Sequence, residues 1–183
     1  MHLDAIEGIL EPDNTTQWRW NHIGNGIVAA GQRLAAAGYH PEFIGPSTTS
    51  MANAAPWLDS VLTVPGVLNY LKEISYHRYI GVSDANLAAI GARGAAHNLR
   101  TSQLEHIGSG VDALYKDLTI ANVSAWQQFT LAFPTSDNGA QYFTISGNQP
   151  VMGSRTKLLR QYFRYVPLGA QRVAATSSSG GVR

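Results

Sequence analysis

The chain has 183 residues, 44% of them hydrophobic and 14% charged, so it is long enough for one domain with a sizeable core. Its net charge of +1 favours neither nucleic acid nor an anionic membrane as a partner, because both require clustered Lys and Arg. Cysteine is absent, which excludes disulfides, thiolate metal sites and cysteine nucleophiles. No window approaches the roughly 18 apolar residues of a membrane span, and the first residues lack the layout of a secretion signal.

Short apolar runs alternate with longer helical ones along the chain, which is typical of a parallel sheet built from βα units. The predicted strands are Leu3 to Leu10, Glu42 to Ser47, Ile74 to Tyr79, Thr101 to Ile107 and Ala125 to Phe133. The first helix is expected from Trp18 to Ala37, where apolar residues recur every three to four positions. Asn14 or Thr15 is expected to cap it.

Four further helical segments are predicted. The first follows residue 50 and is expected to be broken by Pro56 and Pro65, with Val67, Leu68 and Leu71 in its last turns. The others are Ser83 to Arg93, opened by a cap-type residue, Val111 to Ile120, and Arg155 to Tyr165.

The last third of the chain is expected to contain more irregular structure. Ser136 to Gly153 is rich in Gly, Asn and Pro and predicts a long loop or a hairpin, with Gln141 to Ile145 as its strand. A short strand is expected from Ala170 to Ala175, and Ser177 to Gly181 has the composition of a linker.

Five strands with helices between them suit an open doubly wound sheet or part of a (β/α)8 barrel. The barrel is favoured because Glu11, His77, Glu105 and Trp126 would all lie at the C-terminal ends of strands, where barrels carry their catalytic residues. A doubly wound nucleotide-binding fold would instead require a glycine fingerprint after its first strand. The fold predicted is therefore α/β, a partial (β/α)8 barrel with parallel strands.

Two glutamates at strand ends are the catalytic residues that a retaining glycosidase requires, because it uses one carboxyl as acid/base and the other as nucleophile. Retention requires the two carboxyl groups to lie about 5 Å apart, against roughly 6.5 to 9.5 Å for inversion. Repulsion between like charges at that distance favours one protonated and one ionised carboxyl. Glu11 and Glu105 are the candidates, and their substrate would be a neutral carbohydrate.

Four motifs follow one another in a familiar order: Leu10-Glu11-Pro12, Tyr76-His77-Arg78-Tyr79, Leu104-Glu105-His106 and Ser124-Ala125-Trp126. They resemble strand ends four, six, seven and eight of the clan A retaining glycoside hydrolases, which have (β/α)8 barrels. The sequence is most similar to family thirty of these enzymes, which includes glucosylceramidases, xylanases and β-1,6-glucanases. The segment from Leu158 to Val173 strengthens the likeness, because it resembles the passage from barrel to β-sandwich in that family.

The resemblance implies that Glu11 is the general acid/base and Glu105 the nucleophile. Tyr79 would orient the nucleophile, His77 would contact the bound sugar, and Trp126 would stack beneath it, with Phe129 as a competitor for that role. His106 and Asn14 complete the candidate substrate-binding residues. No cofactor and no metal are implied.

The resemblance also predicts the organisation of the chain. Residues 1–168 would be the C-terminal portion of the barrel, and residues 169–183 a strand and flexible tail leading toward an accessory β domain. A whole barrel takes about 250 residues, so a fragment starting at strand four is expected. Secretion or periplasmic location is implied by the family, while the oligomeric state stays open.

One departure from the family pattern concerns Leu10, which stands where an Asn normally hydrogen-bonds the 2-hydroxyl of the sugar. Loss of one such donor removes a few kcal/mol of transition-state stabilisation. The alternative is therefore a catalytically silent carbohydrate-binding relic. Other readings stay open from the residues alone: Glu11 as a solvated turn residue, His77 and His106 as structural histidines or metal ligands, and Trp126 as a core residue.

Overall fold

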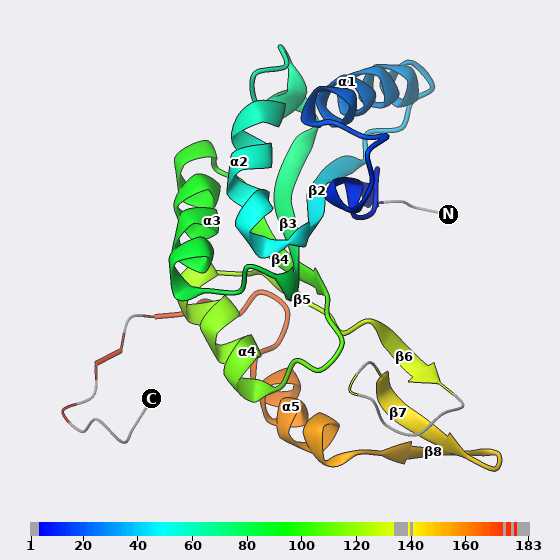
Figure 1. The fold of residues 1–183 in the computed structure, drawn as a ribbon, viewed down its shortest axis with the longest axis vertical. Helices are drawn as coiled ribbons and strands as arrows, with labels where there is room; N and C mark the ends of the chain where they lie inside the picture. Colours follow the sequence, from blue (N-terminus) through cyan, green and yellow to red (C-terminus); the bar gives the residue numbers. More distant parts are fainter. Residues whose placement is uncertain (1–3, 134–138, 140, 174, 177, 179–183) are drawn as a thin grey trace.

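A five-stranded parallel sheet forms the centre of the fold (Figure 1). The structure, a computed structural model, describes residues 4–133, 139, 141–173, 175–176 and 178. The strands are β1 (Ala5–Glu7), β2 (Glu42–Ser50), β3 (Leu71–Ile80), β4 (Arg100–Glu105) and β5 (Ala125–Trp126). All neighbours are parallel, and the spatial order is the order along the chain. A doubly wound sheet would reverse its order, so the predicted partial barrel is confirmed.

Helices connect the strands and cover one side of the sheet (Figure 1). They are α1 (Trp20–Ala36), α2 (Met51–Val61), α3 (Asp84–His97) and α4 (Val111–Lys116) with a π-helical continuation (Asp117–Ala121). A last helix, α5 (Ser154–Tyr165), follows the final strand and packs against α4 and the second, smaller sheet. Two 3-10 turns, Pro12–Asn14 and Val67–Asn69, precede α1 and β3. Of the two residues expected to cap α3, Ser or Asp, the structure shows Ser83 in that role, because its hydroxyl accepts a hydrogen bond from the N–H of Asn86.

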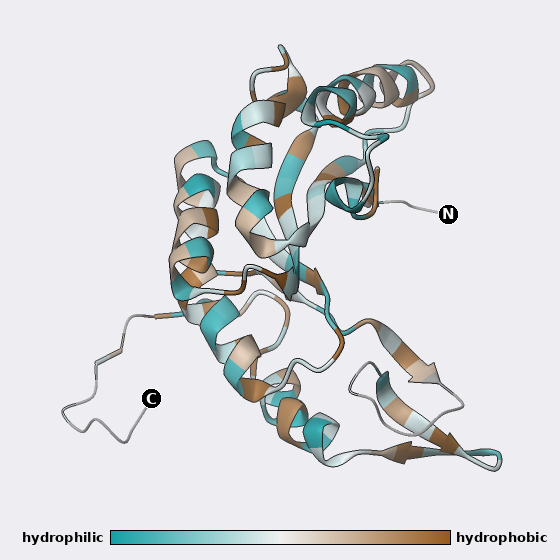
Figure 2. Ribbon diagram, viewed as in Figure 1, coloured by the Kyte–Doolittle hydropathy of each residue, from teal (hydrophilic) through white to brown (hydrophobic). Residues whose placement is uncertain are grey.

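The core lies between the sheet and these helices. Ile23 and Ile27 on α1 and Ile74 and Tyr76 on β3 are at most 4% exposed, and Figure 2 shows hydrophobic residues recurring along these elements. Close approach is required at Gly31, where a Cβ atom would lie 2.4 Å from the ring of Tyr70. The apolar stripe predicted on the first helix is thus the face that packs on the sheet.

Several predicted boundaries are wrong. The first strand, predicted from Leu3 to Leu10, ends already at Glu7, because the chain leaves the sheet there to make the turn at Glu11; Leu3 lies outside the described residues. Helix α2 continues through Pro56, which is exposed and donates no backbone hydrogen bond to the helix. Leu71 begins β3, and Val67 and Leu68 belong to a separate 3-10 turn.

The helix α1 begins later than expected and has a different cap. Arg19 occupies the cap position without a side-chain hydrogen bond, so neither Asn14 nor Thr15 caps this helix. The reason is that Asn14 belongs to the 3-10 turn Pro12–Asn14 and Thr15 ends it, and the non-helical residues 16–19 lie between that turn and the helix.

The predicted strand Ala125 to Phe133 is divided between two sheets. β6 (Thr130–Phe133), β7 (Gln141–Ser146) and β8 (Gln149–Met152) form a second, smaller sheet that projects beside α5 (Figure 1). The division occurs where β4 ends: the N–H of Phe129 still reaches the carbonyl of His106, but no further β4 residue is left to pair. The predicted strand from 141 and its hairpin are confirmed.

Two expectations concern the C-terminal part. Residues 170–173 and 175 contain no strand, so the strand predicted from Ala170 to Ala175 is not formed in the described part of that segment. Most of the predicted linker Ser177 to Gly181, and residues 134–138 and 140 of the predicted loop, lie outside the described residues. The division of the chain at residue 168 stays a prediction.

Candidate active site

Glu11 lies at a sharp turn between β1 and the 3-10 turn Pro12–Asn14. Its backbone is left-handed, with φ of 47° and ψ of 53°, a conformation that residues with a Cβ adopt at an energetic cost. Its N–H donates to the carbonyl of Ser47 at 3.0 Å, which ties the turn to β2. Glu11 is thereby presented at the C-terminal end of β1, as predicted.

Glu105 is the last residue of β4, and a change of register decides its direction. Tyr76 of β3 pairs with Gln103 of β4, but the next β3 residue, His77, pairs with Glu105, so Leu104 is an extra residue. Register partners in a sheet point to the same side, so Glu105 lies on the side of His77. If Leu104 instead paired with His77 in regular register, Glu105 would pair with Arg78 and lie on the opposite, helix-covered side.

The two carboxylates meet at the C-terminal edge of the sheet. One oxygen of Glu11, one oxygen of Glu105 and one ring nitrogen of His77 all lie within 4.8 Å of one another. We call Glu11 and Glu105 the carboxylate pair. Both are partly exposed, so a ligand can reach them.

His77 connects the sheet to Glu11. Its Nδ1 is 2.9 Å from Glu11 Oε1, its side chain is fully buried, and its Nε2 has no hydrogen-bond partner among the residues that the structure describes. Since His77 already contacts Glu11, its most direct role here is to hold that carboxylate. The predicted contact between His77 and a sugar stays a prediction.

Tyr79 holds the other member of the pair. Its hydroxyl donates to Glu105 Oε1 at 2.9 Å, and the orientation of a nucleophile by this contact stays a prediction. Desolvation raises the pKa of the Tyr79 hydroxyl well above its usual value, and the hydrogen bond to Glu105 and the charges of Glu105 and Glu11 act in the same direction. Tyr79 therefore stays protonated and remains a donor across the physiological pH range.

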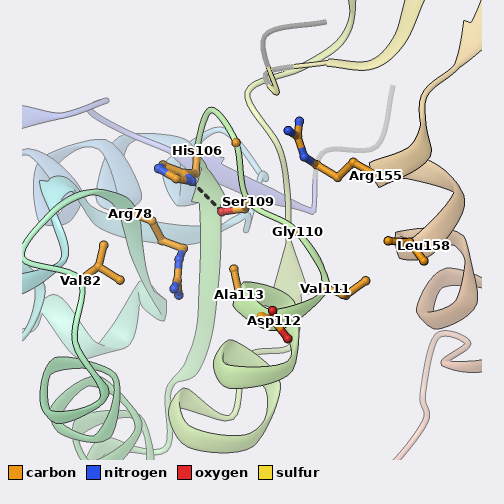
Figure 3. Close-up of a pocket in the computed structure, with 11 residues that line it drawn as sticks. Arg78, Val82, His106, Ser109, Gly110, Val111, Asp112, Ala113, Arg155 and Leu158 are labelled. Carbon is orange, nitrogen blue, oxygen red and sulfur yellow. Dashed lines mark hydrogen bonds between the residues drawn. The ribbon is translucent and has the colours of Figure 1, made fainter.

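His106 lies beside Tyr79, with ring centroids 5.2 Å apart, and its Nδ1 is 2.6 Å from the hydroxyl oxygen of Ser109. Burial lowers the pKa of His106, and the positive charge of Arg78 lowers it further. His106 and Arg78 also line a pocket of about 510 Å3 that extends to Arg155 and Leu158 on α5 (Figure 3). Neither carboxylate lines this pocket, so it adjoins the pair without containing it.

Two predicted substrate contacts are placed differently by the structure. Trp126 donates its indole N–H to Asp117 at 2.8 Å and packs partly against the core, away from the carboxylate pair. Its contact with a sugar stays a prediction, and Phe129, 44% exposed, stays the competitor. Asn14 is exposed, and its amide donates to Glu11 Oε2 at 3.3 Å.

Two important carboxylates are not predicted from the sequence. Asp13 accepts hydrogen bonds from the backbone at the start of α2, and Asp117, fully buried, binds Tyr76, Arg78 and Trp126. Burial raises the pKa of the Asp117 carboxyl, whereas these donors act in the opposite direction. The only sequence signal is the acidic residue itself, because all but one of these partners lie more than 30 positions away.

Among the described residues, Glu11, His77 and Glu105 are also a group whose geometry could hold a metal ion. The nitrogen of His77 that faces Glu11 is already used in the hydrogen bond between them, and both carboxylates have protein donors. These contacts suit a carboxylate pair kept apart and oriented by hydrogen bonds.

No helix of the described residues is long and apolar enough to cross a membrane.

Comparison with known proteins supports this architecture. No protein-family profile and no curated protein matches the sequence. Among solved structures, the catalytic domain of GH30 xylanase C from Talaromyces cellulolyticus is similar, with a TM-score of 0.74 and 15% identity over 97% of this chain and 44% of that chain. A GH30 endoxylanase from Clostridium papyrosolvens C71 has a TM-score of 0.71 and 18% identity over 95% of this chain and 44% of that one.

A third similar structure is SrfJ from Salmonella typhimurium, with a TM-score of 0.76 and 10% identity over 92% of this chain and 44% of that chain. The chain thus spans less than half the length of these structures. At such identities the likeness shows the fold, which is that part of the (β/α)8 barrel of GH30 catalytic domains to which this chain aligns. The predicted partial barrel is confirmed at the level of the fold.

Proposed function

We propose that the chain carries the catalytic carboxylates of a retaining β-glycosidase. The observation that carries the proposal is the approach of the two carboxylates to within 4.8 Å, which matches the separation of about 5 Å used for retention. Inverting enzymes leave about 6.5 to 9.5 Å between the carboxyl groups for a water molecule. Because the chain covers less than half of its structural neighbours, the activity of the whole barrel is part of the proposal.

In this mechanism Glu11 and Glu105 act in two steps. Protonated Glu11 gives its proton to the glycosidic oxygen while the Glu105 carboxylate attacks the anomeric carbon, so the aglycone leaves and a glycosyl ester forms on Glu105. Glu11, now ionised, takes a proton from water, and that water cleaves the ester and regenerates both groups. His77 holds Glu11 and Tyr79 holds Glu105 during both steps.

The first substrates to test are β-linked xylose glycans, because two of the similar structures are described as xylanases. The protein is incubated with 2-fluoro-β-xylosides and 2-fluoro-β-glucosides, which trap the glycosyl ester. After trypsin digestion the adduct is expected on the peptide of residues 101–116, which contains two carboxylates, Glu105 and Asp112. Fragmentation in the mass spectrometer then distinguishes them.

An adduct on Glu105 that disappears in Glu105→Gln supports the proposal, and Asp112→Asn is the matched control. Labelling of another residue would refute the assignment of the nucleophile.

A second function, a silent carbohydrate-binding barrel, is favoured by Leu10, which is 57% exposed beside Glu11 and has no side-chain donor. Binding of xylo-oligosaccharides in calorimetry, without labelling or hydrolysis, would support that alternative.

A further inference from the structure

The turn that presents Glu11 needs support from outside itself. A left-handed backbone at a glutamate is strained, and such conformations persist where surrounding contacts hold them. Within the turn, the N–H of Asn14 donates to the Glu11 carbonyl at 3.1 Å, which closes the turn but does not fix its position on the sheet. The hydrogen bond to Ser47 gives one external tie.

Asp13 supplies three more ties, all to the segment where β2 passes into α2. Its Oδ1 accepts from the N–H of Thr49 at 2.7 Å, and its Oδ2 accepts from the N–H of Ser50 at 3.1 Å and the amide of Asn53 at 2.9 Å. Ser50 is the residue before α2, a helix of 11 residues, and makes no side-chain cap of its own. The Asp13 carboxylate therefore accepts from the backbone N–H groups of the last two residues of β2, directly before the amino end of α2, where negative charge is favourable.

We propose that Asp13 is the positioning residue of Glu11. By fixing the turn to the amino end of α2, it holds the left-handed backbone of Glu11 and keeps the Glu11 carboxylate at the 2.9 Å distance from His77. The effect of Asp13 on catalysis rests on the function proposed above, whereas its effect on the position of Glu11 does not. Asp13 acts only through Glu11, because its own oxygens are engaged by Thr49, Ser50 and Asn53.

The geometric consequence is measured on the His77 ring. Long-range nitrogen NMR spectra report the two ring nitrogens, and Glu11→Gln supplies the reference spectrum of a ring that has lost its carboxylate partner. Asp13→Ala is expected to shift the Nδ1 signal of His77 toward that reference. The matched control is Asp84→Ala, in the first turn of α3, whose carboxylate pairs with Lys116 at 2.7 Å. It is expected to leave the His77 signals unchanged.

The catalytic consequence is measured as leaving-group dependence. Displacing the general acid slows the hydrolysis of substrates whose aglycone must be protonated to leave. General acid catalysis typically accelerates such reactions about 10²- to 10⁴-fold. Asp13→Ala is expected to lower kcat/KM at least about tenfold for alkyl β-xylosides and less than about threefold for dinitrophenyl β-xyloside. General loss of structure would lower both equally.

The two readouts separate the possible failures. If the wild-type protein hydrolyses and labels nothing, the proposed function fails, while the His77 spectrum still tests Asp13. A wild-type His77 spectrum in folded Asp13→Ala would overturn the positioning role. If Asp13→Ala does not fold, Asp13→Asn is used instead, because it keeps the shape and one acceptor but opposes the remaining N–H donors with an amide. The same shift of the His77 signal is expected, and its absence counts against the proposal.

Discussion

Replacing Asp117 by alanine tests the buried polar centre behind β3 and β5. Asp117 is fully buried in the π-helical segment and accepts hydrogen bonds from Tyr76 at 2.7 Å, Arg78 at 2.5 Å and Trp126 at 2.8 Å. The alanine variant leaves three buried or partly buried donors without this acceptor. It also leaves the charge of Arg78, whose residue is 6% exposed, without its salt-bridge partner.

The expected magnitude follows from that unpaired charge. Removing one partner of a buried ion pair destabilises a protein by about 3–5 kcal/mol, because the other charge stays buried. The matched control is Asp59→Ala, which breaks the pair between Asp59 and Arg93, whose side chains are 47% and 35% exposed. Exposed pairs contribute about 0–1 kcal/mol. The two aspartate variants should therefore differ by at least about 2 kcal/mol.

Urea unfolding followed by circular dichroism measures the free energy of unfolding of each variant. With a slope of about 2 kcal/mol per molar, the midpoint of Asp117→Ala should fall by about 1.5–2.5 M. Replacing both partners, Asp117→Leu with Arg78→Met, should recover much of this loss, since no buried charge remains. Equal destabilisation by Asp117→Ala and Asp59→Ala would refute the reasoning.

Three further predictions concern the candidate site. Tyr79→Phe removes a hydrogen bond to a charged group, and such a bond contributes about 1.5–3 kcal/mol. The variant should therefore slow 2-fluoroxyloside labelling of Glu105 about 10- to 100-fold, and an unchanged labelling rate would contradict this prediction. Leu10→Asn adds a donor beside the acid/base and should raise kcat/KM, by up to about 100-fold; no gain would count against Leu10 as the limiting residue. In NMR titrations the lowered pKa of His106 should place its midpoint below about 6.5, the ordinary value of a histidine. The stability that neutral His106 contributes is then present above about pH 6.5 and lost as the pH falls, and a midpoint above that ordinary value would refute this.

Periodicity in the sequence predicted those parts of the fold that depend on local patterns. The apolar repeat gave the position of α1 and the buried face with Ile23 and Ile27, and the Ser83 cap gave the start of α3. These features are set by residues within a few positions of one another. The alternation of strands and helices likewise predicted the parallel sheet, since short βα units leave few other arrangements.

Features that depend on partners far along the chain could not be predicted in the same way. Which side of the sheet Trp126 faces depends on its register with Gln103, and the indole is found with Asp117 on the helix-covered side. Asp13 finds Thr49 and Asn53 only because the turn folds back onto α2, 36 and 40 positions later. Composition and spacing do not indicate which residues far apart in the sequence will form hydrogen bonds.

The extra residue in β4 gives this site a vulnerability that no substitution scan would reveal. If β4 kept Leu104 but paired in step with β3, every side chain with chemical function would stay in the chain, yet Glu105 would pair with Arg78 and turn from His77 toward the helices. The direction of the Glu105 carboxyl group is thus set by the bulge at Leu104. Redesigned versions of this half-barrel that keep the sequence of β4 but force it into regular pairing should be inert.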